Sequence, residues 1–301
     1  MGQRPWKAAV SCTTLLASAS SMSWICAVLG LASPRALPGQ SPAIEGVPAS
    51  VRAVGMGGAG AALVGDASTI FVNPAGLATI RHLALEGSYA PIPGGSAISL
   101  AAMGLRLGRF DWGAGAQTLT MPGPVKNDDA VLASSLVYRR GLLAFGVTAK
   151  YAHGPGTPAS GQWAGDAGVA LAVFDLFALG ASVQNLGGDS AGGVLPRRVR
   201  AGFTMNYVDP EGVFRLLTTL EAQWPDGAHA AVLTGVEAGV VVGGVGLVGR
   251  AGYTTSALRS GVSKVSFGGG VELGRFSLDY AYRPIDRGGD AQNRFGVRWT
   301  P

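Results

Sequence analysis

The chain has 301 residues, of which 48 are glycine, and carries 23 Lys or Arg against 18 Asp or Glu, a formal net charge of +5. Charged residues make up 14% of the chain, against about 25% in a typical soluble domain, and glycine exceeds twice its usual share of about 7%. This composition argues against an ordinary soluble protein, and so small a positive charge gives no reason to expect nucleic-acid binding.

Residues 1–32 are predicted to be a cleaved signal peptide. Arg4 and Lys7 precede an apolar stretch at 8–31, and Gly30-Leu31-Ala32 offers small residues at the two positions that signal peptidase reads. An earlier cleavage site at Ala17-Ser18-Ala19 and an uncleaved membrane anchor are the alternatives.

Both cysteines of the chain, Cys12 and Cys26, lie in this leader. The mature chain would therefore have no disulfide, no thiol nucleophile and no cysteine metal site. Residues 33–50 are rich in Pro, Gly, Ala and Ser and are expected to form a flexible start to the mature chain.

The stretch from 50 to 80 differs from everything after it. Clustered glycines open it, an apolar run follows, and Asn-Pro-Ala-Gly-Leu closes it. Asp66 or Ser68 is expected to cap a short helix that runs toward Val72, and Pro74 is expected to end that helix. A dinucleotide-binding loop would need a strand before the glycines, and 46–50 makes a poor one. The residues of the motif are Gly55, Gly57, Gly58, Gly60, Asp66, Asn73, Pro74, Ala75 and Gly76.

With Gly-Met-Gly-Gly-Ala-Gly at 55–60, Asp-Ala at 66–67 and Asn-Pro-Ala-Gly-Leu at 73–77, the stretch resembles the N-terminal signature of the PorV/PorQ-like outer-membrane barrels. It is more distantly similar to that of the FadL-like fatty-acid transporters. The resemblance implies that 33–80 holds a plug or hatch segment, in or beneath an outer-membrane barrel. Membrane lipid and the barrel-assembly machinery would then be partners. We expect Asn73 to bond to backbone and fix the turn that docks the segment onto the barrel wall.

From residue 82 onward, apolar and polar residues alternate with a period of two. Leu143 and Phe145, for example, alternate with Thr148 and Lys150. This pattern is typical of barrel strands with one face toward lipid and one toward the lumen. After the leader no run reaches about eighteen consecutive apolar residues, so a closed barrel is the remaining way to cross a bilayer with every backbone group paired.

Residues 81–301 are therefore predicted to form an all-β, antiparallel transmembrane barrel of about fourteen strands. The predicted strands are 82–90, 96–107, 110–120, 130–139, 141–152, 163–173, 176–186, 197–207, 213–223, 229–239, 243–254, 264–273, 275–283 and 292–300.

The charged side chains with lumen parity are expected to pair with one another, or alternatively to line a polar path. They are Lys150, Arg215, Glu221, Glu272, Asp279 and Arg283. His82, His153 and His229 lack the spacing of metal ligands, and Asp128-Asp129 is expected to be a solvated loop pair. No serine lies in a Gly-x-Ser-x-Gly elbow. Neither enzyme activity nor a cofactor or metal is predicted.

Two function classes remain, with a barrel of purely structural role as a third alternative. The PorV-like resemblance implies a carrier or assembly component that passes secreted protein cargo to surface-attachment machinery in type IX secretion. The alternative, implied by the FadL-like resemblance, is a transporter of hydrophobic small molecules such as long-chain fatty acids. The compact loops favour the carrier. A carrier predicts an exposed apolar patch on the loops, whereas a transporter predicts an apolar pocket beside the plug.

Overall fold

The computed structural model describes residues 44, 47–92, 94–123, 128–154, 161–173, 176–188, 195–207, 213–255, 263–284 and 291–301. The predicted signal peptide, both cysteines and most of the predicted flexible start at 33–50 lie outside these residues. Within them, no helix has the length and apolar character needed to cross a membrane.

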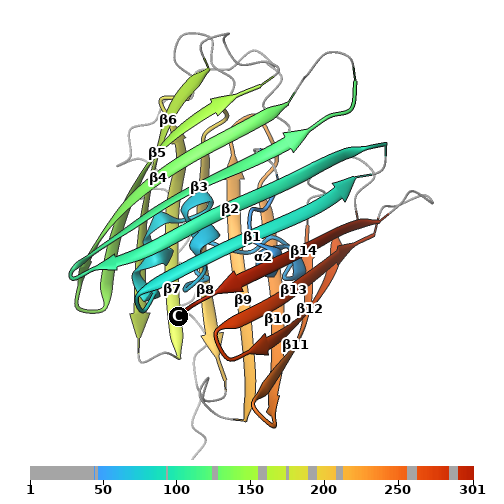
Figure 1. Ribbon diagram of the computed structural model, residues 1–301. Coiled ribbons are helices and arrows are strands. Elements are labelled where there is room, and N and C mark those ends of the chain that lie inside the picture. Colours follow the sequence, from blue (N-terminus) through green and yellow to red (C-terminus); the bar gives the residue numbers. More distant parts are fainter. Residues whose placement is uncertain are drawn as a thin grey trace, which may run out of the picture. The chain divides into compact units, whose positions relative to one another are not determined.

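Fourteen antiparallel strands close into a barrel, as the alternation predicts (Figure 1). Each strand pairs with its neighbours in the chain, and β1 pairs with β14 to close the ring. Every bound lies within three residues of its predicted position. The strands are β1 (Leu83–Ile92), β2 (Ser96–Leu107), β3 (Phe110–Thr120), β4 (Asp129–Arg140), β5 (Leu143–His153), β6 (Gln162–Val173), β7 (Phe177–Leu186), β8 (Arg198–Asn206), β9 (Phe214–Pro225), β10 (Ala231–Val242), β11 (Val245–Thr254), β12 (Val265–Leu273), β13 (Phe276–Arg283) and β14 (Gln292–Trp299).

The two ends of the barrel carry different connections. One end, here the turn end, holds short links such as 108–109, 141–142 and 243–244 together with the start of β1. The opposite end, here the loop end, holds longer links such as 121–128 and 255–264. This asymmetry is usual for membrane barrels, in which the short turns face the periplasm.

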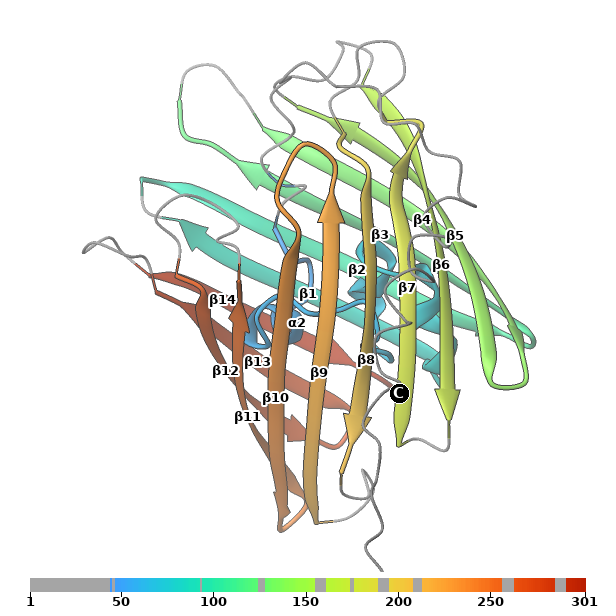
Figure 2. The same cartoon turned by 180° about the vertical axis from the view of Figure 1, so that it is seen from behind.

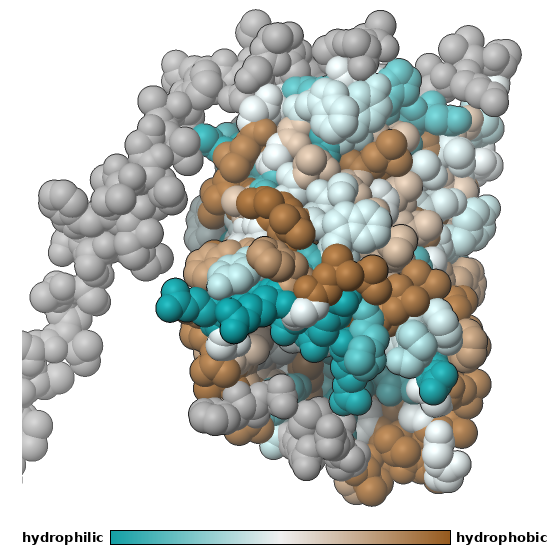
Figure 3. Space-filling model, turned by 60° about the vertical axis from the view of Figure 1, so that its left-hand side comes forward, coloured by the Kyte–Doolittle hydropathy of each residue, from teal (hydrophilic) through white to brown (hydrophobic). Residues whose placement is uncertain are grey.

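The outer face of the strands is apolar. Phe145, Val147 and Phe214 are 47%, 58% and 64% exposed, although all three are strongly hydrophobic. Brown and pale side chains cover most of the face in Figure 3, with the hydrophilic ones gathered in a band. Such a surface is stable in lipid rather than in water.

Aromatic pairs stand on this outer face near both ends of the barrel. Phe276 and Trp299 pack together at the turn end, and Tyr151 and Trp163 pack together at the loop end. Aromatic girdles at two levels mark the membrane–water interfaces of barrels. The structure thus has the lipid-out, lumen-in arrangement that the alternation predicts.

Residues 47–80, here the inner segment, lie within the ring of strands (Figures 1 and 2). The segment contains α2 (Val51–Gly55) and the 3-10 helices η1 (Ala67–Phe71) and η2 (Pro74–Thr79). α2 packs on β11–β14, whereas η1 and η2 pack on β1–β7. The segment therefore spans the lumen from one wall to the other.

The expectation of a capped helix toward Val72 was wrong in two respects. η1 is a 3-10 turn of five residues, and the Asp66 side chain makes no capping bond because its carboxylate pairs with arginines instead. Pro74 does follow the end of η1, but it also begins η2, where its missing N–H costs nothing.

A belt of lumen-facing wall glycines makes room for the inner segment. At each of them an added Cβ would press on a residue of the segment, often on its backbone. Glycine, with no Cβ, lets two backbones approach to direct contact. This belt accounts for part of the glycine excess of the chain. Its members are Gly104, Gly113, Gly115, Gly146, Gly168, Gly180, Gly235, Gly252, Gly268 and Gly296.

Candidate functional site

The glycine run at 55–60 is the point where the inner segment crosses β10–β12. Gly57 has a φ of +77°, and a Cβ there would lie 2.7 Å from the Tyr253 carbonyl oxygen. Its N–H donates to Ser266 Oγ over 3.0 Å. Gly58 also has a positive φ, of +93°. Glycine is required here both by the backbone conformation and by the contact with the wall.

Glu221 on β9 holds the next residues of the segment. Its Oε2 accepts the N–H groups of Gly60 and Ala61 over 2.7 and 2.6 Å. Arg200 on β8 pairs with Oε1 of the same carboxylate over 2.5 Å and donates to the Gly58 carbonyl over 2.9 Å. These bonds satisfy backbone groups that an irregular buried segment cannot satisfy by itself.

Asn73 is fully buried and bonds only to backbone. Its Nδ2 donates to the carbonyls of Ala61 (2.7 Å) and Val169 on β6 (3.1 Å), while its Oδ1 accepts the Ala75 N–H (3.1 Å). One side chain thus joins the two halves of the inner segment, caps η2 and ties both to the barrel wall. Pro74 and Ala75 press directly against Gly146 of β5, and Gly76 packs against Thr69 of η1.

Asn73→Ala should lower the free energy of unfolding by about 1–3 kcal/mol, because it leaves buried backbone groups without partners. Urea unfolding of the detergent-folded protein, followed by tryptophan fluorescence, measures the change. Asn293→Ala is the matched control, since Asn293 bonds to the Tyr280 hydroxyl in an exposed pair on the outer face. Equal stability of the two variants would contradict the role assigned to Asn73.

A cluster of buried charges, here the arginine–carboxylate cluster, joins α2 to the wall on the turn-end side of the lumen. Glu237 of β10 lies at its centre, with both carboxylate oxygens bonded to Arg52 (2.9 and 3.0 Å) and Oε2 also bonded to Arg250 (2.7 Å). Bidentate pairs between arginine and carboxylate are the strongest of their kind. The members are Arg52, Asp66, Arg215, Glu237, Arg250, Glu272, Asp279 and Arg298.

Two members of the cluster belong to the inner segment. Burial works to raise the pKa of Asp66, but attraction to Arg298 and Arg52 outweighs it and holds the pKa below its usual range. Burial likewise works to lower the pKa of Arg52, yet Glu237 and Asp66 leave it above its usual value. Arg52 and Asp66 are therefore charged at neutral pH, and they hold the segment to the wall by ion pairs.

The lumen charges predicted to pair do so with one exception. Lys150 pairs with Asp166 over 2.9 Å, while Arg215, Glu221, Glu272 and Asp279 all belong to ion pairs described above. Arg283 has no partner among the described residues. Arg52, Glu237 and Arg250 were not predicted. Strand parity would have placed Glu237 and Arg250 in the lumen, but nothing in the sequence indicated that they converge.

A cavity of about 300 Å³ lies beside η2 at the turn end. Alanine, leucine and valine dominate its lining, which η2, β5, β6 and the 141–142 turn supply. Pro74–Thr79 thus forms one of its walls. The lining residues are Val64, Ala75, Ala78, Thr79, Arg139, Gly141, Leu142, Leu143, Ala144, Ala170, Leu171 and Ala172. This is the apolar pocket beside the inner segment that a transporter of hydrophobic molecules predicts.

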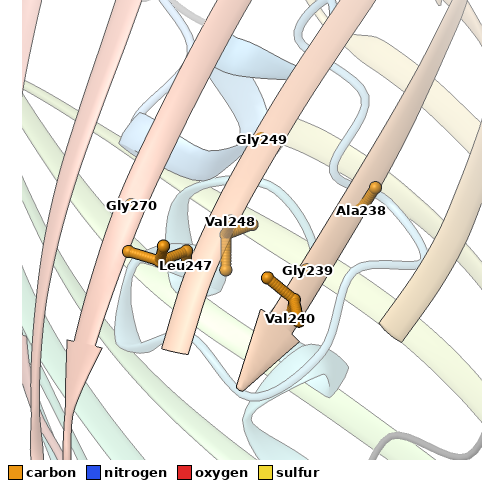
Figure 4. A pocket seen from close by; sticks show the side chains of 7 residues that line it. All are labelled: Ala238, Gly239, Val240, Leu247, Val248, Gly249 and Gly270. Carbon is orange, nitrogen blue, oxygen red and sulfur yellow. The ribbon is translucent and has the colours of Figure 1, made fainter. Parts of the chain in front are cut away.

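A second cavity, of about 490 Å³, lies at β10–β12 near the turn end (Figure 4). It is lined by Ala238, Gly239, Val240, Leu247, Val248, Gly249 and Gly270. None of these side chains is polar, so this cavity offers no group to orient a ligand.

Among the described residues, no group of three or more His, Cys, Asp or Glu side chains is placed so that it could hold a metal ion. All three histidines are exposed: His153 is the last residue of β5, whereas His82 and His229 lie on two different connections. Asp128 accepts the Met121 N–H within its own loop, whereas the neighbouring Asp129 is buried rather than solvated, which corrects one half of the predicted pair.

Neither a protein-family model nor a curated protein sequence matches the chain. Solved structures do match its fold. They include the CymD monoaromatic hydrocarbon channel (TM-score 0.56, 12% identity, 85% of this chain and 98% of that one) and the Pseudomonas putida toluene transporter TodX (0.58, 12%, 83% and 97%). A Pseudomonas aeruginosa FadL homologue also matches (0.56, 13%, 84% and 99%). At these identities the match establishes a shared fold and nothing finer.

Proposed function

We propose that this chain is an outer-membrane channel or transporter for small hydrophobic molecules. The apolar cavity beside η2 carries the proposal, because it lies where the inner segment meets the wall of a closed barrel. The three proteins named above are described as a monoaromatic hydrocarbon channel, a toluene transporter and a FadL homologue, which favours transport over the secretion-carrier hypothesis. The apolar loop patch that a carrier predicts falls largely on residues outside the described ranges.

The size of the cavity points to a small ligand. At about 300 Å³ it is at the lower end of the range for ligand pockets, which suits one aromatic ring or a short alkyl chain rather than a long acyl chain. Arg139 contributes the one charged side chain of the lining, and that side chain is engaged by Asp111 over 2.7 Å. Selection would therefore rest on shape and on burial of apolar surface.

In this proposal the inner segment is the gate. Ion pairs and side-chain bonds to backbone hold its first half, from α2 to the glycine run. Its second half, with η1 and η2, also packs with the wall in a continuous apolar core. The first half is therefore the part that could move between two sets of polar contacts without exposing a large apolar surface. The ligand would enter from the loop end and reach the cavity once the segment shifts.

Ala170→Phe should reduce uptake of toluene by cells that express the protein by at least about tenfold, because the ring fills the cavity. Ala170 faces the lumen opposite Ala144, and both line the cavity. Headspace gas chromatography measures the uptake, and outer-membrane fractionation with heat-modifiability on gels confirms location and folding.

Val169→Phe is the matched control, since the neighbouring residue on β6 points outward and is 42% exposed. Its uptake should equal that of the wild type. Wild-type uptake no faster than in cells without the protein would overturn the proposed function, as would full uptake by correctly folded Ala170→Phe.

A further inference from the structure

Three polar side chains on neighbouring strands meet at the loop-end side of the lumen, away from the arginine–carboxylate cluster. They are Arg283 on β13, Arg294 on β14 and Ser88 on β1, and all three have lumen parity. Arg294 pairs with Ala281, two residues before Arg283, while Ser88 pairs with Gly296, two residues after Arg294. Diagonal neighbours of this kind lie about 7–8 Å apart at their Cα atoms, well within reach of two arginine side chains.

Arg283 is 2% exposed, yet its Nε and Nη2 have no hydrogen-bond partner among the described residues. Arg294 is 4% exposed, and the acceptors it has within the described part of the chain are the neutral carbonyls of Pro48 and Ala49. The Ser88 hydroxyl is buried and also unpartnered. Two buried guanidinium groups and a hydroxyl therefore converge with no carboxylate bonded to them among the described residues, although the charge of Glu86 reaches Arg294 without forming an ion pair.

Other arginines in the lumen differ from these two because they are paired with carboxylates. Arg52, Arg200, Arg250 and Arg298 each form an ion pair with a buried carboxylate. Glu86, two residues from Ser88 on the same face of β1, accepts the Ser68 N–H and lies opposite Arg298. A buried cation without a bonded carboxylate is strongly destabilising, and Arg283 and Arg294 are thus exceptions in a barrel that neutralises its other described lumen arginines.

We propose that Ser88, Arg283 and Arg294 form a binding site for the carboxylate group of a small amphipathic organic acid. Planar guanidinium groups match the two oxygens of a carboxylate, and the hydroxyl supplies a further donor. The adjoining lumen wall is apolar: Ala90 follows Ser88 on the same face, and its partner on β2 is Ile98. Ala90 and Ile98 are 6% and 5% exposed and belong to the apolar core that contains Ile44. The carboxylate would lie on the arginines, and the apolar body of the acid would replace part of the packing that now covers Ala90 and Ile98.

This site goes beyond the proposed function, because it lies at the opposite end of the lumen from the η2 cavity and would give anions a place that hydrocarbons cannot use. Its test is equilibrium binding to the purified full chain in detergent, which does not require transport. Absence of transport would thus leave the site standing, and absence of binding would leave the proposed function standing.

Benzoate and benzamide, equal in size but charged and uncharged, are the probes for isothermal titration calorimetry. The wild type should bind benzoate at least about tenfold more tightly than benzamide, a difference of about 1.4 kcal/mol. Arg283→Gln with Arg294→Gln should remove that preference by weakening benzoate binding at least about tenfold. Arg140→Gln, which removes an exposed arginine at the end of β4, is the matched control and should bind benzoate like the wild type.

A melting experiment supplies a second readout that a purely structural role would not produce. Arg283→Met should melt at a higher temperature than the wild type without ligand, because the unpaired charge is gone, and should lose the upward shift that benzoate gives the wild type. The proposal is overturned if the wild type shows no benzoate-dependent shift, if it binds phosphate but not benzoate, or if Arg283→Met melts at a lower temperature.

Discussion

Gly252→Val should prevent the inner segment from docking. Gly252 faces the lumen on β11, directly against the backbone of Met56 and Gly57, so that an added Cβ would overlap the Gly57 nitrogen. Both sides of this contact are backbone, and neither can rotate away as a side chain would. Overpacking of this kind costs about 1–3 kcal/mol where side chains can adjust, and we expect the upper end of that range or more here.

The readout is limited trypsin digestion of the folded protein. Arg52 is held in the docked segment by Glu237, so cleavage after Arg52 reports release of the segment from the wall. Gly252→Val should be cut there many times faster than the wild type and should unfold at a lower urea concentration.

Gly249→Val on the same strand is the matched control. Gly249 points outward, and an added Cβ would meet no atom within 4 Å. The same three carbon atoms therefore enter open space, and both the cleavage rate and the stability should stay at the wild-type level. If the two variants behaved alike, the wall glycines would have no role in docking the segment.

The belt also marks the limit of what the sequence can predict. The bounds of the strands could be predicted closely because each strand is recognised from its own alternation with a period of two and from the turn residues that flank it. Gly146 and Gly168, for example, sit at lumen parity within predicted strands. What they contact depends on where the inner segment crosses the lumen, and parity contains no information on that path.

In the candidate site too, some residues can be identified from local sequence and others only from the fold. Asn73 could be singled out because an asparagine before a proline has a strong local preference for bonding to backbone. Glu237 could not, since its importance comes from Arg52, 185 positions away in the chain, and from Arg250 on the next strand. The η2 cavity is likewise produced by alanines on elements far apart in the sequence, which no local pattern distinguishes from other alanines.

Glu237→Gln should be the most destabilising change in the arginine–carboxylate cluster. The substitution keeps the shape of the side chain but removes the charge that Arg52 and Arg250 share, and Arg215 lies 3.5 Å from the same carboxylate. Breaking a buried ion pair on one side costs about 3–5 kcal/mol, because the partners stay buried and uncompensated. Urea unfolding should show a loss of this size, together with faster tryptic cleavage after Arg52.

Asp226→Asn is the control for loss of one carboxylate from an ion pair. Asp226 pairs with Arg197 over 3.1 Å, but its side chain is 45% exposed, so the change should cost at most about 1 kcal/mol.

A double-mutant cycle then separates charge pairing from packing. If Glu237 acts by holding Arg52, adding Arg52→Gln to Glu237→Gln should cost far less than Arg52→Gln alone costs the wild type, because the double variant buries one uncompensated charge fewer. Additive effects of the two changes would instead mean that the pair does not hold the inner segment. The gate would then depend on the wall glycines and Asn73, and opening it would require breaking close packing rather than exchanging ion pairs.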